Sequence, residues 1–169
     1  MRRLKSRNYP TSSSRPDAGF SLIELLVVVA VILIIAAIAI PNYISSRMRA
    51  NEGAAVQNMR TITTSELVYS TTYGIGFSTT LLQLQENGSI VDQNEAGLID
   101  QVLASRTKGG YLYTYTVLTT DSLGNPTTYS LTAAPKTPGS TGQRYYYTDQ
   151  TGVIRYNVMA AAGSTDLPI

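Results

Sequence analysis

The feature that most constrains this chain is an apolar run of 21 residues, Phe20 to Ile40, which contains one charged side chain, Glu24. As an α-helix, at about 1.5 Å per residue, the run would be roughly 31 Å long, close to the thickness of the hydrocarbon core of a bilayer. A carboxylate in such a segment costs about 2.5–3.5 kcal/mol, so it normally has a partner or a function. No Lys or Arg lies between Phe20 and Arg47. We therefore expect the partner of Glu24 to be an amino terminus created by cleavage, or a group on another molecule.

The charge of the chain changes sign at the start of this run. Residues 1–19 carry five basic and one acidic side chain, a net charge of +4, and the rest of the chain carries 8 basic and 10 acidic side chains, a net charge of −2. The positive-inside rule predicts that the basic segment stays in the cytoplasm. Because the basic excess is confined to that segment, the overall charge of +2 does not predict nucleic-acid binding.

The sequence contains no cysteine and no histidine. It can therefore form no disulfide, although an exported domain would permit one. It also lacks the usual zinc ligands and the commonest general base. We expect no enzyme activity, no cofactor and no metal site.

Residues 19–28 (GFSLIELLVV) and 36–41 (AAIAIP) resemble the amino-terminal segment of type IV prepilins and of type II secretion pseudopilins. The resemblance implies that a prepilin peptidase cuts after Gly19 and that Phe20 becomes the N-methylated first residue. It implies that Glu24, the fifth residue of the mature chain, serves in subunit assembly. The implied partners are the peptidase, membrane lipid before assembly, an inner-membrane assembly machinery, and identical or related pilin subunits in a filament.

Other interpretations of the amino-terminal segment stay open. An ordinary secretory signal would be cut after Ala39, but Leu25–Ile40 is slightly too long for its apolar region and Glu24 would have no function. An uncleaved single-span anchor is a second alternative. Arg2-Arg3 alone gives little support to a twin-arginine signal. The position of Glu24 does not separate a pilus subunit from a pseudopilin, nor adhesion, motility, DNA uptake and secretion as the task of the filament.

The helix is expected to continue beyond the apolar run. Pro41 lacks an amide hydrogen and crowds the preceding turn, which predicts a kink or local melting. Beyond Pro41, apolar side chains recur at spacings of 3, 4 and 7 and form one helical stripe: Ile44, Met48, Ala55, Met59, Ile62 and Tyr69. The pattern ends at Tyr73-Gly74, and we expect the globular part of the chain to pack on this stripe.

Residues 75–110 are expected to connect the helix to a sheet through short helices. Ser78 is the expected cap of the first one. The acidic residues of this region do not follow the spacing of a calcium loop, so a solvated acidic surface is the better interpretation: Glu86, Asp92, Glu95 and Asp100.

From Tyr111 onward, apolar and aromatic side chains recur at every second residue, as in a β-strand. Tyr111, Tyr113, Tyr115 and Val117 would share one face of a strand. Further strands are expected at 127–133, 144–148 and 153–157, the last two forming a hairpin. Eleven of the twelve tyrosines follow residue 19. We interpret them as packing residues of the strands, with ligand binding and electron transfer as open alternatives.

The sequence therefore predicts an α+β, pilin-like chain in which a long amino-terminal helix packs on a three- or four-stranded antiparallel sheet. The expected segments are a cleaved basic leader (1–19), a transmembrane and assembly helix (20–46), and a periplasmic or extracellular head (47–169). The head would comprise the second half of the helix (47–73), the connecting region (75–110), the sheet (111–157) and a loosely packed tail (158–169). The leading functional hypothesis is a structural subunit of a type IV pilus-like filament, with a periplasmic pseudopilin as the alternative.

Overall fold

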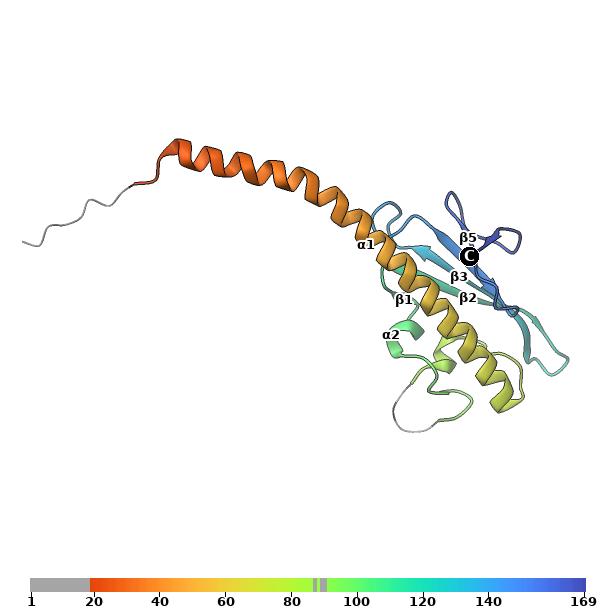
Figure 1. Ribbon diagram of the computed structural model, residues 1–169. Helices are drawn as coiled ribbons and strands as arrows, with labels where there is room; N and C mark the ends of the chain where they lie inside the picture. Colours follow the sequence, from red (N-terminus) through yellow and green to blue (C-terminus); the bar gives the residue numbers. More distant parts are fainter. Residues whose placement is uncertain (1–18, 87, 89–90) are drawn as a thin grey trace, which may run out of the picture. The chain divides into compact units, whose positions relative to one another are not determined.

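The computed structural model describes residues 19–86, 88 and 91–169 (Figure 1). Apart from Gly19, the predicted leader lies outside the described residues. The chain divides into two compact units, Met1–Ala39 and Ile40–Ile169. The helices are α1 (Leu22–Tyr73), the short 3₁₀ helix η1 (Leu81–Leu84) and α2 (Gln101–Ala104). The strands are β1 (Thr107–Lys108), β2 (Tyr111–Thr120), β3 (Pro126–Pro135), β4 (Tyr145–Asp149), β5 (Arg155–Asn157) and β6 (Leu167–Pro168).

Helix α1 confirms the long helix that the sequence predicts, including its end at Tyr73. Gly74 follows in the left-handed conformation with φ 66° and donates its amide to Ser70 O at 3.0 Å. This is a common helix ending, because glycine adopts that conformation without a Cβ clash. The helix continues through Pro41, so no local melting occurs there. A kink at Pro41 stays a prediction.

Among the described residues the sheet has six antiparallel strands in the order β1-β2-β3-β4-β5-β6, which is more than the predicted three or four. Strands β2 to β5 are the ones that alternation predicts. The two additional strands, β1 and β6, are two residues long, which is too short for an alternating pattern to be recognised. Within the predicted tail, Leu167–Pro168 pairs with Arg155 and Tyr156, although both residues of the pair Leu167–Pro168 are exposed.

One face of α1 packs on one face of the sheet within the unit Ile40–Ile169 (Figure 1). The predicted stripe is confirmed from Ala55 onward, since Ala55, Met59, Ile62 and Tyr69 are buried. Ile44 is exposed and Met48 is half-buried, so the first part of the stripe does not join this core. On the sheet, the buried face includes Tyr111, Tyr113 and Tyr115, which the period of two predicts, together with residues of β3 and β4: Tyr129, Leu131, Ala133 and Tyr146.

The buried tyrosines of the strands pack as predicted, whereas Tyr69 and Tyr73 lie on α1 and Tyr43, also on α1, is exposed. The Tyr115 and Tyr129 rings stack with centroids 5.1 Å apart, and the Asn58 amide on α1 donates to Tyr113 Oη at 2.9 Å. The Tyr111 hydroxyl donates to Arg144 O at 2.9 Å. Buried aromatic rings with bonded hydroxyl groups contribute both apolar area and specific polar contacts to the core of the head.

Candidate functional site

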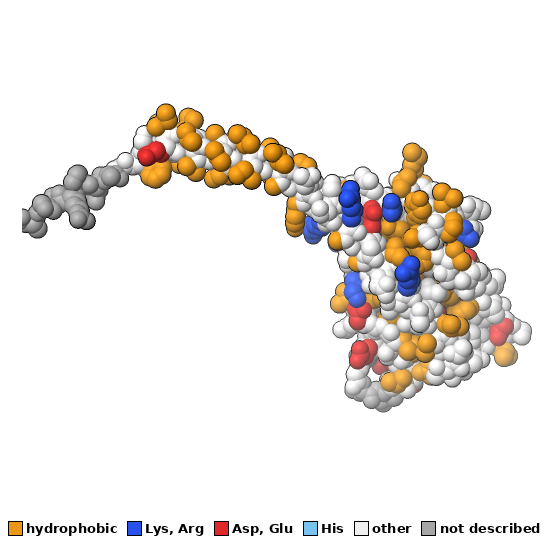
Figure 2. Space-filling view, viewed as in Figure 1, with side chains coloured by type: hydrophobic (Ala, Val, Ile, Leu, Met, Phe, Trp, Pro, Cys, Tyr) orange, Lys and Arg blue, Asp and Glu red, His pale blue; other side chains and the backbone are white. Residues whose placement is uncertain are grey.

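The apolar segment at the start of α1 is exposed along its whole length. The large apolar side chains from Phe20 to Ile40 are between 45% and 80% exposed (Figure 2). An 18-residue window of α1 has a mean hydropathy of 3.3, which makes α1 long and apolar enough to cross a membrane. An apolar surface of this length is not expected to stay in water, so it marks a site for lipid or for other helices.

Glu24 lies in the first turn of this segment. Its Oε2 accepts a hydrogen bond from the Ser21 amide at 2.9 Å, and Ser21 O accepts from the Leu25 amide at 3.2 Å. Glu24 therefore provides one half of a capping box, and its negative charge lies near the positive end of the helix dipole. This intrachain partner was missed by the sequence analysis, although the spacing of Ser21 and Glu24 is the pattern that predicts it. Within the described residues, no cation is paired with Glu24.

Gly19 and Phe20 precede the first turn of α1, outside the helix. Both are exposed, and a Cβ placed on Gly19 would meet no atom within 4 Å. Phe20 and Glu24 line a shallow hollow together with Ile23, Val27 and Val28. The structure thus places three of the four predicted site residues at one end of α1, while Pro41 lies within the helix.

A second polar cluster, centred on Glu66, was not predicted. Glu66 belongs to α1 and is fully buried. Its Oε1 accepts from the Ser78 hydroxyl at 2.5 Å and its Oε2 accepts from the Ser78 amide at 2.9 Å, while Tyr115 Oη donates to Ser78 O at 2.9 Å. Ser78 is therefore not the helix cap that the sequence predicts; Thr80 precedes η1, and its side chain makes no capping bond.

Burial raises the pKa of Glu66 above its ordinary value of 4.5, and the two bonds from Ser78 lower it in part. Burial is also the main cause of the raised pKa of Tyr115, with the neighbouring Glu66 carboxylate adding to it. The cluster joins the end of α1 to the segment before η1 and to β2. Because every partner is already bonded within the head, we assign this cluster a structural role.

Among the residues that the structure describes, no group of three or more His, Cys, Asp or Glu side chains could hold a metal ion. Two of the acidic residues between η1 and α2, Asp92 and Asp100, make local contacts. Asp100 caps α2 by accepting from the Leu103 amide at 3.0 Å, and it pairs with Lys108 at 2.6 Å. The Lys108 bond is the main reason that the pKa of Asp100 is lowered.

Comparison with known proteins matches the amino-terminal segment to a family model. Residues 14–40 match the model of the prokaryotic N-terminal methylation motif. The chain is similar to the type IV major pilin protein PilA of Myxococcus xanthus (48% identity over 50 residues, 30% of this chain and 23% of that protein). It is also similar to the type IV wide pilus major component PilA4 of Thermus thermophilus (59% identity over 38 residues, 22% of this chain and 29% of that protein). The chain thus spans less than a third of the length of these two curated relatives.

The similarity to a fimbrial protein of Pseudomonas aeruginosa is longer, with 36% identity over 104 residues, 52% of this chain and 68% of that protein. The chain therefore belongs to the type IV prepilin family. No solved structure matches the chain significantly.

Proposed function

We propose that the chain is a structural pilin subunit that polymerises through its amino-terminal helix into a type IV pilus-like filament. The observation that carries the proposal is the exposed apolar segment from Phe20 to Ile40 with Glu24 in its first turn. In this proposal the prepilin lies in the inner membrane with residues 1–19 in the cytoplasm. A prepilin peptidase cuts between Gly19 and Phe20, and the new amino terminus of Phe20 is methylated.

Cleavage supplies a cation at the start of a segment that has no Lys or Arg between Phe20 and Arg47. In lipid, the apolar side chains contact hydrocarbon and Glu24 keeps the Ser21 amide as its partner. In the filament, the amino terminus of a neighbouring subunit pairs with Glu24 in surroundings of low dielectric constant. Attraction between opposite charges is much stronger there than in water, although desolvation offsets much of it. A subunit that docks out of register leaves one charge buried and unpaired, so the pair selects the correct register.

The experiment replaces Glu24 by Ala or by Gln in the full chain, in a host that retains the assembly machinery. Glu24→Ala removes a charge that opposes membrane insertion, so insertion and cleavage are expected to be normal. Filament yield should fall strongly, because the incoming amino terminus finds no carboxylate. Glu24→Gln preserves the shape of the side chain without its charge and should fail similarly. The measurement compares mature subunit in the membrane with filament sheared from the cells.

Ser21→Ala is the matched control. It changes the same turn of the helix but leaves both the Ser21 amide and the Glu24 carboxylate in place, so filament yield should stay normal. Normal filament yield from Glu24→Ala would refute the charge-pairing mechanism. Filament that forms but is retained in the periplasm would favour the alternative within the family, a pseudopilin of a type II secretion system.

A further inference from the structure

The head carries a hollow of about 600 Å³ between the first turns of its part of α1 and the carboxyl-terminal half of the sheet. Its lining combines apolar and charged side chains: Ser45, Met48, Arg49, Glu52, Gly53, Val56, Gln143, Arg144, Tyr146, Val158 and Ile169. We call this hollow the α1 groove. All of its lining belongs to the unit Ile40–Ile169.

The rim of the α1 groove has excess positive charge. Glu52 is engaged by the head itself, because its Oε1 accepts from the amides of Gln143 at 2.9 Å and Arg144 at 3.3 Å. The Arg144 guanidinium lies 5.1 Å from the centre of the Tyr156 ring and 3.9 Å from Glu52. Arg49 is exposed and has no hydrogen-bond or ion-pair partner among residues 19–86, 88 and 91–169. The groove therefore offers a mixed polar and apolar lining and a cation, Arg49, that is available to a partner.

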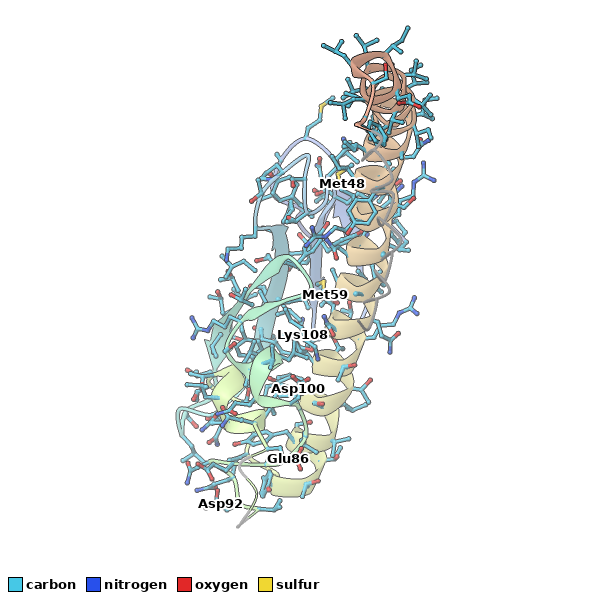
Figure 3. The ribbon with its side chains drawn as sticks, turned by 90° about the vertical axis from the view of Figure 1, so that its left-hand side faces the viewer. Met48, Met59, Glu86, Asp92, Asp100 and Lys108 are labelled. Carbon is cyan, nitrogen blue, oxygen red and sulfur yellow. The ribbon has the colours of Figure 1, made fainter. Side chains whose placement is uncertain are left out.

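The opposite end of the head carries a projection of complementary chemistry. Val91 is 73% exposed, and the neighbouring Asp92 is exposed as well. The loop is held in shape by Asp92 Oδ1, which accepts from the Asn94 amide at 2.7 Å and the Glu95 amide at 3.0 Å. The Tyr69 hydroxyl on α1 anchors the loop by donating to Gln93 O at 2.7 Å. Figure 3 shows Met48, in the groove, and Asp92 at opposite ends of the head.

A second exposed apolar side chain, Leu123, is 84% exposed in the β2–β3 turn. The acid beside it, Asp121, already accepts from the amides of Leu123 at 2.9 Å and Asn125 at 2.8 Å and from the Asn125 side chain at 3.0 Å. Its carboxylate is therefore engaged through both oxygens by its own turn. The Val91–Asp92 pair is the better match for a groove of mixed lining with an arginine on its rim, because only one carboxylate oxygen of Asp92 is used by its own loop.

We propose that the α1 groove of one subunit receives Val91 and Asp92 of a second copy of this chain, so that Asp92 pairs with Arg49. The inference rests on the proposed function, because it adds a contact between heads to an assembled filament. Groove residue Glu52 and Tyr69, beneath the loop, are 17 residues apart on α1, about 25 Å along the helix. The two surfaces differ, so the contact is head to tail and repeats along an open filament instead of closing a dimer. The contact between Arg49 and Asp92 mainly fixes the orientation and register of the two heads. Most of the affinity between subunits comes from the apolar segments, residues 20–40 of each chain.

The absence of cysteine makes a direct test possible. Filaments are assembled from the full chain carrying Arg49→Cys and Asp92→Cys together, sheared, treated with a bis-methanethiosulfonate cross-linker and separated without reductant. The expected result is a ladder of covalent oligomers that collapses on reduction. The cross-linker supplies a spacer, because the long arginine side chain holds the Cα atoms of such a pair farther apart than the roughly 7 Å that a direct disulfide tolerates. Each single variant should remain monomeric, since the contact joins two different surfaces.

Charge neutralisation gives an independent test. Arg49→Gln and Asp92→Asn should each lower the yield of sheared filament about three-fold, a coupling within the range of exposed ion pairs. Asp92→Asn retains a side-chain oxygen for the two loop amides. The double variant should lose no more than either single variant, and losses that multiply would overturn the inference.

Three cross-linking outcomes would also overturn it: no ladder, dimers from a single variant, or a ladder from Arg49→Cys with Leu123→Cys in place of Asp92→Cys. The outcome stays distinguishable from a failure of the proposed function. If the unaltered chain forms no filament, the proposed function is wrong; if it forms filaments without the predicted cross-link, only the head contact is wrong.

Discussion

The buried bond between Ser78 and Glu66 allows a quantitative test of the head structure. Ser78→Ala removes the hydroxyl that donates to Glu66 Oε1 at 2.5 Å and leaves the Ser78 amide bond to Oε2. Both side chains are fully buried, so no water replaces the lost donor directly. A hydrogen bond to a charged group contributes about 1.5–3 kcal/mol, and we expect the free energy of unfolding to fall by that amount. For a unit of this size, Tm should fall by roughly 5–12 °C.

The assay is thermal and denaturant unfolding of the detergent-solubilised full chain. Unfolding of the head is followed by the circular dichroism and fluorescence of its tyrosines. Ser70→Ala is the matched control, because the Ser70 hydroxyl bonds only to Leu67 O in its own helix and is expected to change stability by less than about 0.5 kcal/mol. If Ser78→Ala has the same Tm and the same free energy of unfolding as the wild type, the reasoning about this cluster is wrong.

The pH dependence of stability provides a second readout of Glu66. Because burial raises the pKa of Glu66 above 4.5, the folded protein binds a proton in a pH range where the unfolded chain has released it. The contribution of Glu66 to stability is therefore greatest below pH 4.5 and is lost as the pH rises through the raised pKa. The stability of wild type relative to Glu66→Gln should rise as the pH is lowered through this window. A difference between the two proteins that does not change with pH would contradict the argument.

Two further predictions follow from the head structure. Gly76→Ala should destabilise the head by more than Gly74→Ala, because both glycines have positive φ but only a Cβ at Gly76 would collide with Pro126 O, which is fixed by the Phe77 amide at 2.9 Å. Gly74→Ala should cost about 1–2 kcal/mol and Gly76→Ala clearly more, as measured by denaturant unfolding; equal costs would contradict the close approach. A fragment of residues 47–169 should be soluble, monomeric at low concentration and insensitive to reductant, because it contains the buried core and no cysteine, as measured by light scattering with and without reductant. Aggregation of this fragment under all conditions would show that the apolar segment is needed to complete the head.

The sequence predicts those parts of the fold in which a single helix or strand repeats the same apolar spacing over several residues. The stripe from Ala55 to Tyr69 and the buried face from Tyr111 to Tyr115 are both long enough for their periods to be recognised, and both are confirmed. Strands β1 and β6 have two residues each, and their pairing depends on neighbours that lie elsewhere in the sequence. No local pattern marks them.

The polar contacts were harder to predict for a related reason. Glu66 looks like an exposed charge in the sequence, and its burial depends on Ser78, which the turn after Gly74 brings back to α1. For Glu24, the cost of a carboxylate in an apolar segment predicted that it has a partner or a function, and the resemblance to prepilins implied a role in assembly. The capping bond to Ser21 adds a local role to that prediction. The cap and the proposed pairing use the same carboxylate, and one accepted bond leaves it able to accept another.

The most direct test of the central claim is the intact mass of the subunit recovered from sheared filaments. The account predicts a chain of residues 20–169 carrying one additional methyl group, because cleavage after Gly19 creates the amino terminus that pairs with Glu24. A filament subunit that retains residues 1–19 would contradict the proposed charge pair. A mature protein that begins at Ile40 would contradict it more completely, because that chain would lack the entire apolar segment.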